Sequence, residues 1–94
     1  MHSIREDELV TARVRKFTQV YSSFEAYYYD ITWRLARDPK LGSRIGQQIP
    51  GLNPPTYVIE TAAMRPLGIP KIRIIYSVDD NYITVKALTV YEVK

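Results

Sequence analysis

The clearest pattern in the chain is helical and covers residues 22–37. Apolar side chains recur there at intervals of three and four residues and fall within one arc of a helix: Phe24, Tyr27, Tyr28, Ile31 and Leu35. Ser22 and Glu25 have the spacing of a capping box, which predicts the start of the helix. Asp38-Pro39 predicts its end, because the residue before a proline disfavours helical backbone. A short second helix is expected to follow, with Leu41, Ile45 and Ile49 on one side.

The C-terminal half of the chain has the pattern of strands. Between residues 71 and 78, alternate positions are apolar: Ile72, Ile74, Tyr76 and Val78. Residues 79–81, Asp-Asp-Asn, are typical of a turn, and residues 82–91 are again rich in strand formers. The two runs therefore predict an antiparallel hairpin. A strand at 57–63, joined to the hairpin through the proline-bracketed loop 64–70, makes a three-stranded meander.

Residues 10–21 fit two patterns. Val10, Val14, Phe17 and Tyr21 have helical spacing, whereas Ala12, Val14, Thr18 and Val20 alternate as in a strand. We interpret the segment as a strand, because a strand ahead of the main helix completes a β-α-α-β-β-β layer with one face packed on that helix. The predicted fold is a single small α+β domain over residues 1–94 with a mainly antiparallel sheet. Residues 1–9 are expected to be a flexible or covering N-terminal extension.

Composition narrows the possible chemistry. The chain of 94 residues has no cysteine, and its one histidine, His2, lies at the start. This argues against thiolate or histidine metal sites and against Ser-His-Asp catalysis, so we expect no metal and no cofactor. No apolar run approaches the roughly 18–20 residues of a membrane span. The first residues also lack the apolar core of a signal peptide, and we expect a cytoplasmic protein without membrane contact.

The charge is mildly basic and unevenly distributed. The formal net charge is +3, and residues 11–50 carry seven basic against three acidic side chains, whereas residues 1–10 carry one against three. This bias is compatible with a polyanionic partner such as nucleic acid, with an acidic protein partner, or with an ordinary solvated surface.

Two stretches carry a resemblance to a known family. RLARDPKLGSRI (34–45) is similar to a helix end at which an Asp/Asn-Pro-x-x-Gly step leads to a second helix. KIRIIYSVDDNYITVKALTVYE (71–92) is similar to a hairpin in which an Arg-x-x-Tyr strand precedes an acidic turn and a hydrophobic strand. Over residues 12–92 the chain resembles the RelE/ParE-type toxins of bacterial type II toxin–antitoxin modules. The resemblance implies the β-α-α-β-β-β order, a cognate antitoxin as partner, and action as an endoribonuclease on mRNA at the ribosome or as an inhibitor of gyrase.

The family's catalytic positions carry over only in part. By position, Arg73 and Tyr91 correspond to the family's strand arginine and terminal tyrosine, and Glu60 corresponds more loosely to a strand carboxylate. The family's mRNA-cleaving members have several basic residues on the strand before the Arg-x-x-Tyr strand, whereas YVIETAA (57–63) offers only Glu60. They also have an arginine or histidine beside the tyrosine, whereas this chain has Thr89-Val90-Tyr91. The gyrase-inhibiting branch needs none of these residues.

The residue types at Glu60, Arg73 and Tyr91 suit one reaction, the cleavage of RNA. RNA cleavage by attack of the 2′-hydroxyl needs a base, an acid and a cation. Alternation puts Arg73 on the sheet side opposite the apolar set, together with Lys71, so Arg73 is the candidate cation or an ordinary solvated residue. Tyr91 is a candidate proton donor or a packing residue. Glu60 is a candidate general base.

Further basic residues are candidate nucleic-acid contacts: Lys71, Lys86 and Arg65. We place Lys86 in register with Leu88 and Tyr82, where it could contact phosphate or guard a sheet edge against aggregation. A separate interpretation is a small nucleic-acid-binding protein that relies on Arg13, Arg15 and Lys16.

Tyr29 and Trp33 suggest a partner surface. They are spaced i, i+4 on the main helix and project away from its apolar stripe. Exposed aromatic side chains in such a pair fit an interface for the antitoxin or for a second copy of the chain, and the alternative is that the N-terminal residues cover them. A catalytically inactive binding module that uses this surface is the second function class.

Overall fold

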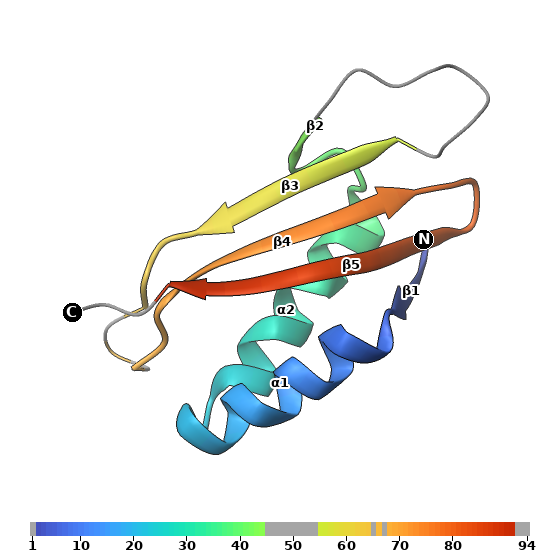
Figure 1. The fold of residues 1–94 in the computed structure, drawn as a ribbon. Helices are drawn as coiled ribbons and strands as arrows, with labels where there is room; N and C mark the ends of the chain where they lie inside the picture. Colours follow the sequence, from blue (N-terminus) through green and yellow to red (C-terminus); the bar gives the residue numbers. More distant parts are fainter. Residues whose placement is uncertain (1, 45–54, 65, 67, 92–94) are drawn as a thin grey trace.

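The computed structural model describes residues 2–44, 55–64, 66 and 68–91. Along them the elements follow the order β1 (Ser3–Glu6), α1 (Glu8–Val20), α2 (Phe24–Arg37), β2 (Ser43–Arg44), β3 (Thr56–Thr61), β4 (Lys71–Val78) and β5 (Tyr82–Tyr91). Figure 1 shows both helices on one side of the long strands β3, β4 and β5. The predicted α+β class is confirmed.

The sheet is mainly antiparallel, as predicted. In the described part of the chain its strand order is β1-β5-β4-β3-β2. β4 and β5 pair from Lys71↔Tyr91 to Val78↔Ile83, which confirms the predicted hairpin. The Asp79 carboxylate closes the turn by accepting hydrogen bonds from the backbone N–H groups of Asn81 and Tyr82, at 3.0 and 2.7 Å. β3 pairs antiparallel with β4, so the predicted meander is also confirmed.

The strand predicted at residues 10–21 is wrong. These residues lie in α1, which runs from Glu8 to Val20 and has Tyr21 as its C-cap. The side chains with helical spacing face the core: Val10, Val14, Phe17 and Tyr21. Ala12 and Val20, which a strand would turn inward, are exposed. Helical spacing prevails because it buries one continuous stripe against α2 and β5.

The first strand comes from the segment expected to be an extension. β1 pairs in parallel with β5, from Ser3↔Tyr82 to Glu6↔Val85. The backbone N–H of Ser3 donates to the Asn81 carbonyl at 2.9 Å, and that of Asp7 donates to the Val85 carbonyl at 3.2 Å. Residues 3–6 are therefore part of the sheet, which corrects the expectation of a flexible or covering extension. The predicted β-α-α-β-β-β order is present, but its first three elements lie earlier in the chain.

The predicted short helix after residue 40 is also corrected. Ser43–Arg44 form β2, which pairs with β3 through Ser43↔Val58 and Arg44↔Tyr57. The backbone is extended here because these residues continue the edge of the sheet. Ile45 and Ile49, which the prediction placed on the same helix, lie outside the described residues.

α2 is the predicted main helix, with a different start. Its N-cap is Ser23 and makes no side-chain hydrogen bond, so the capping box predicted at Ser22 does not form. The predicted stripe faces the core, where Phe24, Tyr28, Ile31 and Leu35 are buried and Tyr27 is partly buried. The sheet completes the core with apolar side chains from β4 and β5: Ile72, Ile74, Tyr76, Ile83, Val85 and Leu88.

Tyr76 joins the sheet to the turn that follows α2. Its ring is buried and stacks on that of Tyr57, with the ring centres 5.6 Å apart. Its hydroxyl donates to the Pro39 carbonyl at 2.9 Å and accepts from the backbone N–H of Gly42 at 2.9 Å. The tyrosine of the Arg-x-x-Tyr strand thus holds both ends of the Pro-x-x-Gly step, so the two stretches that carry the family resemblance are in contact.

Candidate functional site

One face of the sheet turns away from both helices and is left uncovered by the described residues (Figure 1). Strand register decides which side chains lie on it. Glu60 pairs with Arg73 across β3 and β4, and Lys71 pairs with Tyr91 across β4 and β5. The neighbours of Arg73 along β4, Ile72 and Ile74, are fully buried on the helix side. The open face therefore receives the charged members of these pairs, as the alternation predicts.

Four of the predicted site residues form one cluster at the end of this face. Arg73 donates from Nη2 and Nε to Glu60 Oε1, at 2.8 and 3.2 Å. Lys71 Nζ lies 2.9 Å from the other oxygen, Glu60 Oε2. The Tyr91 ring centre lies 5.4 Å from Lys71 Nζ and 5.8 Å from the Arg73 guanidinium carbon, within the range of cation–π contacts. The structure therefore brings Glu60, Lys71, Arg73 and Tyr91 together from three strands.

Charge pairing determines the electrostatics of the cluster. The hydrogen bond from Lys71, followed by that from Arg73, lowers the pKa of Glu60. The hydrogen bond to Glu60 in turn raises the pKa of Arg73. All three side chains remain substantially exposed, so solvent screens these ion pairs. A carboxylate with a lowered pKa is a weak proton acceptor near neutral pH, so the cluster is better suited to holding an anion than to removing a proton.

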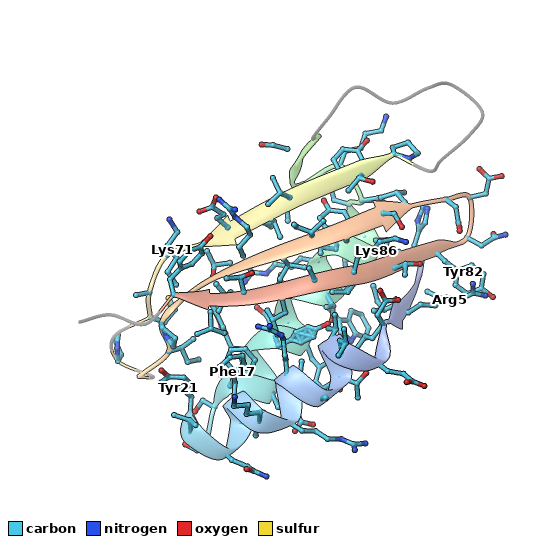
Figure 2. All side chains as sticks on the ribbon, in the orientation of Figure 1. Arg5, Phe17, Tyr21, Lys71, Tyr82 and Lys86 are labelled. Atoms are coloured by element: carbon cyan, nitrogen blue, oxygen red, sulfur yellow. The ribbon has the colours of Figure 1, made fainter. Side chains whose placement is uncertain are left out.

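Lys86 reaches the same face through an irregularity in β5. The β4–β5 register shifts between Ile75 and Tyr76, because Ile75 pairs with Ala87 and Tyr76 pairs with Val85. Lys86 is the extra residue of this β-bulge. It is exposed, whereas Leu88 is buried, so the expectation that Lys86 shares the register of Leu88 is wrong. Figure 2 shows Lys86 on the sheet, away from Phe17 and Tyr21 on the helix side.

A second aromatic and cationic contact lies at the opposite end of the sheet. The guanidinium carbon of Arg5 is 3.3 Å from the centre of the Tyr82 ring, and the two side chains lie together in Figure 2. Arg5 pairs with Thr84 in the β1–β5 ladder. The sequence gives no local signal for this contact, because it depends on pairing between residues at the two ends of the domain.

The remaining predicted nucleic-acid contacts are Arg65 and the basic residues of α1. Arg65 lies outside the described residues. The basic residues of the separate interpretation lie on α1, where Arg13 donates from Nη1 to the Leu88 carbonyl at 3.2 Å and thereby joins α1 to β5. Arg15 and Lys16 are exposed on the same helix. They belong to the helix layer and not to the open face of the sheet.

Tyr29 and Trp33 are exposed, at 44% and 55% of their surface. The N-terminal residues form β1 and α1 and leave this pair uncovered, so the alternative in which those residues cover it is wrong. An open groove along α2 is lined by Ala26, Tyr29, Asp30, Trp33, Arg34 and Arg37. The Arg37 guanidinium carbon lies 5.3 Å from the Trp33 ring, and Arg34 pairs with Asp30 at 3.1 Å. The groove thus combines apolar surface with basic side chains.

The described residues also limit other kinds of site. Among them, no three histidine, cysteine or acidic side chains gather closely enough to hold a metal ion. The helices within the described ranges are too short or too polar to span a membrane. Comparison with protein-family models, with curated proteins and with solved structures finds no match to this chain.

Proposed function

We propose that this chain is a RelE/ParE-type toxin that binds RNA on the open face of its sheet and cleaves it at the Glu60–Lys71–Arg73–Tyr91 cluster. The observation that carries the proposal is the cluster itself, which gathers two cations, a carboxylate and a phenol on a surface that the described residues leave uncovered. Lys86 adds positive charge to the same face of the sheet. A basic surface attracts the phosphate backbone of a nucleic acid.

Two features of the fold support the family part of the proposal. The order of the elements includes the β-α-α-β-β-β series that the resemblance implies. Tyr76 of the Arg-x-x-Tyr strand is hydrogen-bonded to the proline and the glycine of the Asp-Pro-x-x-Gly step, so the two resembling stretches form one structural unit.

The proposed reaction needs no metal. The 2′-oxygen of RNA attacks the neighbouring phosphorus, the bond to the 5′-oxygen breaks, and the products are a 2′,3′-cyclic phosphate and a 5′-hydroxyl. Arg73 and Lys71 stabilise the extra negative charge of the transition state. Tyr91 gives a proton to the leaving oxygen, and Glu60 accepts the proton of the 2′-hydroxyl once the phosphate has drawn the two cations away from it.

Induced expression in a bacterium tests the proposal. We expect growth arrest with loss of mRNA, and purified protein should cut RNA without added metal. Arg73→Ala should relieve the arrest and lower the cleavage rate about 10²- to 10³-fold, by analogy with the loss of one transition-state donor. Arg15→Ala removes the same charge from α1 and should retain activity. Arrest with DNA damage and intact mRNA would point to gyrase instead, and full toxicity of Arg73→Ala would contradict the proposed site.

A second candidate function is RNA binding without cleavage. The observation in its favour is that Glu60 is held by two hydrogen-bonding cations that lower its pKa, which makes it a poor base. Purified protein that binds RNA and leaves it intact under all conditions would favour this function over the toxin.

The proposed protein partner is an antitoxin that occupies the groove on α2. Tyr29 and Trp33 offer apolar surface there, and Arg34 and Arg37 favour an acidic segment. Co-expression with the product of a neighbouring small gene should restore growth, and the two proteins should purify together.

A further inference from the structure

The contact between Arg5 and Tyr82 is built like a stacking platform. The guanidinium carbon lies 3.3 Å from the ring centre, so Arg5 rests on one side of the Tyr82 ring. Arg5 is exposed and Tyr82 is partly covered, so solvent reaches the Arg5 side chain while it rests on the ring. Guanidinium planes are surfaces on which unpaired RNA bases stack. Since Tyr82 already holds the side chain in place, a base that stacks on it costs little further side-chain entropy.

The charges near this contact favour a base over a phosphate. The backbone hydrogen bond from Asn81, followed by that from Tyr82, lowers the pKa of Asp79, and the charge of Arg5 lowers it further. Asp79 is therefore ionised near Arg5 and offsets its charge. A phosphate group would meet both charges, whereas an uncharged base needs only the open plane.

The platform lies on the same sheet as the proposed cleavage cluster, at the other end of β5. This strand has 10 residues, from Tyr82 to Tyr91. At about 3.3 Å per residue its ends are roughly 30 Å apart. Lys86 projects from the bulge between them, and Figure 2 shows Lys71, Lys86 and the Arg5–Tyr82 contact spread along the sheet in that order. A single strand of at least about four nucleotides can occupy such a length.

We propose that Arg5, supported by Tyr82, is a base-stacking subsite for single-stranded RNA whose backbone passes Lys86 and reaches the Glu60 cluster. This inference rests on the proposed function, because it takes RNA as the ligand of the open face. It adds two details: the position at which one base is held, and the line along the sheet that the RNA strand follows.

Abasic scanning of a bound oligonucleotide tests the subsite. The probe is a fluorescent 2′-O-methyl oligoadenylate of about eight nucleotides, long enough to cover the face and unable to be cut because its 2′-oxygens are blocked. One abasic nucleotide is moved along it, and the dissociation constant is measured by anisotropy. We expect one position near an end of the probe at which loss of the base weakens binding roughly 5- to 150-fold, the range of a single stacking contact.

Arg5→Lys tests whether that base stacks on Arg5, because lysine keeps the charge and lacks the plane. We expect the variant to bind the intact probe as weakly as the wild type binds the critical abasic probe, with no further loss when both changes are combined. Arg15→Lys, the same change on α1, should bind like the wild type. Lys86→Ala should lower the slope of affinity against salt by about one, whereas Arg5→Lys should leave it unchanged.

The outcomes separate this inference from the proposed function. If the wild type does not bind the probe, or if Lys71→Ala and Arg73→Ala bind it as well as the wild type, the proposed function is contradicted. If binding depends on Lys71 and Arg73 but no abasic position weakens it, only the stacking subsite is overturned. The same holds if the losses of affinity from Arg5→Lys and from the critical abasic change add up. The scan on the wild-type protein gives this answer even if a variant fails to fold.

Discussion

At the scale of single residues, Glu60 sets the charge of the candidate site. Its two oxygens bind different cations, Arg73 at Oε1 and Lys71 at Oε2. An RNA phosphate that approaches either cation competes with this carboxylate. In the proposed function Glu60 therefore opposes RNA binding even though the proposed reaction needs it, and the two effects can be measured separately.

Glu60→Gln should raise RNA affinity and abolish cleavage. The amide cannot form the ion pairs, so both cations become available to phosphate, and the slope of affinity against salt should increase by about one. The amide also cannot accept the proton of the 2′-hydroxyl. Anisotropy with an uncleavable oligonucleotide and a cleavage assay with ordinary RNA check the two results. Weaker RNA binding by the variant would show that Glu60 holds Lys71 and Arg73 in the geometry that binds phosphate.

Lowering the pH should have the same effect on binding as this substitution. Because the pKa of Glu60 is lowered in the folded protein, the carboxylate stabilises the fold above its unfolded pKa, which is about 4.3 for a glutamate. That stabilisation is lost as the pH falls through the lower, folded pKa. In this range we expect the affinity of the wild type for RNA to rise, while its melting temperature falls more than that of Glu60→Gln.

A second residue, Gly42, is required by close packing. A Cβ atom there would lie 2.6 Å from the Val58 carbonyl oxygen and 2.7 Å from the Tyr76 hydroxyl. Gly42→Ala should therefore lower the free energy of unfolding by about 1–3 kcal/mol, the usual cost of overpacking, in a urea titration. Ser43→Ala, the neighbouring exposed position, should stay within about 0.5 kcal/mol of the wild type. Equal stability of the two variants would contradict the close approach.

The sequence predicts some of these residues and not others, for a physical reason. Alternation along one strand is a local signal, and it correctly predicts that Arg73 and Lys71 face away from Ile72 and Ile74. The bulge at Lys86 shifts the register by one residue, and the apolar positions of β5 change phase there, a signal that the prediction for Lys86 does not use. The contacts of Glu60 with Arg73 and of Arg5 with Tyr82 depend on how separate strands align, which local pattern does not specify.

At the scale of elements, the β4–β5 hairpin and α2 are predicted correctly, whereas α1 is mistaken for a strand and the short strand β1 is missed. The β4–β5 hairpin and α2 each have a sustained apolar period. β1 has 4 residues, and Ile4 is the one apolar side chain among them, so its strand character comes from its pairing with β5. Because β1 is not predicted, the strand that the fold needs ahead of the main helix is assigned to residues 10–21. In the structure these residues are helical.

The buried stripe of α2 can be tested with a matched pair of leucines. Leu35 on α2 is fully buried, whereas Leu9 on α1 is 78% exposed. Leu35→Ala should lower the free energy of unfolding by about 2–5 kcal/mol, through lost burial and the cavity left behind. Leu9→Ala should change it by less than about 0.5 kcal/mol. Thermal or urea unfolding measures both, and similar losses in the two variants would contradict the assignment of the core face.

At the scale of the whole molecule, the two candidate surfaces lie on different layers. The open face belongs to the sheet, and the groove with Tyr29 and Trp33 lies along α2. Figure 1 shows α2 in the helix layer, on one side of the long strands. A partner on the helix layer does not have to touch the RNA-contacting side chains. Separate surfaces therefore predict that variants of one leave the function of the other unchanged.

Changing Tyr29 and Trp33 together to serine tests this separation. The double variant should stay folded, because both side chains are exposed, and should keep its affinity for RNA. It should lose association with the antitoxin, or with a second copy of the chain, in a pull-down and in sedimentation. Arg73→Ala should show the reverse, with association retained and cleavage lost. Unfolding of the double variant would show that the pair belongs to the core.

The parallel pairing of β1 with β5 has a consequence for the order in which the proposed RNA-contacting face forms. Residues 3–6 are synthesised well before their partners, residues 82–85. Chains are made from the N-terminus, and contacts between distant residues form late in folding. A growing chain therefore carries both helices before Arg5 has Tyr82 to rest on or Lys71 has Tyr91 beside it. The proposed RNA-contacting face is therefore assembled only when β5 has left the ribosome.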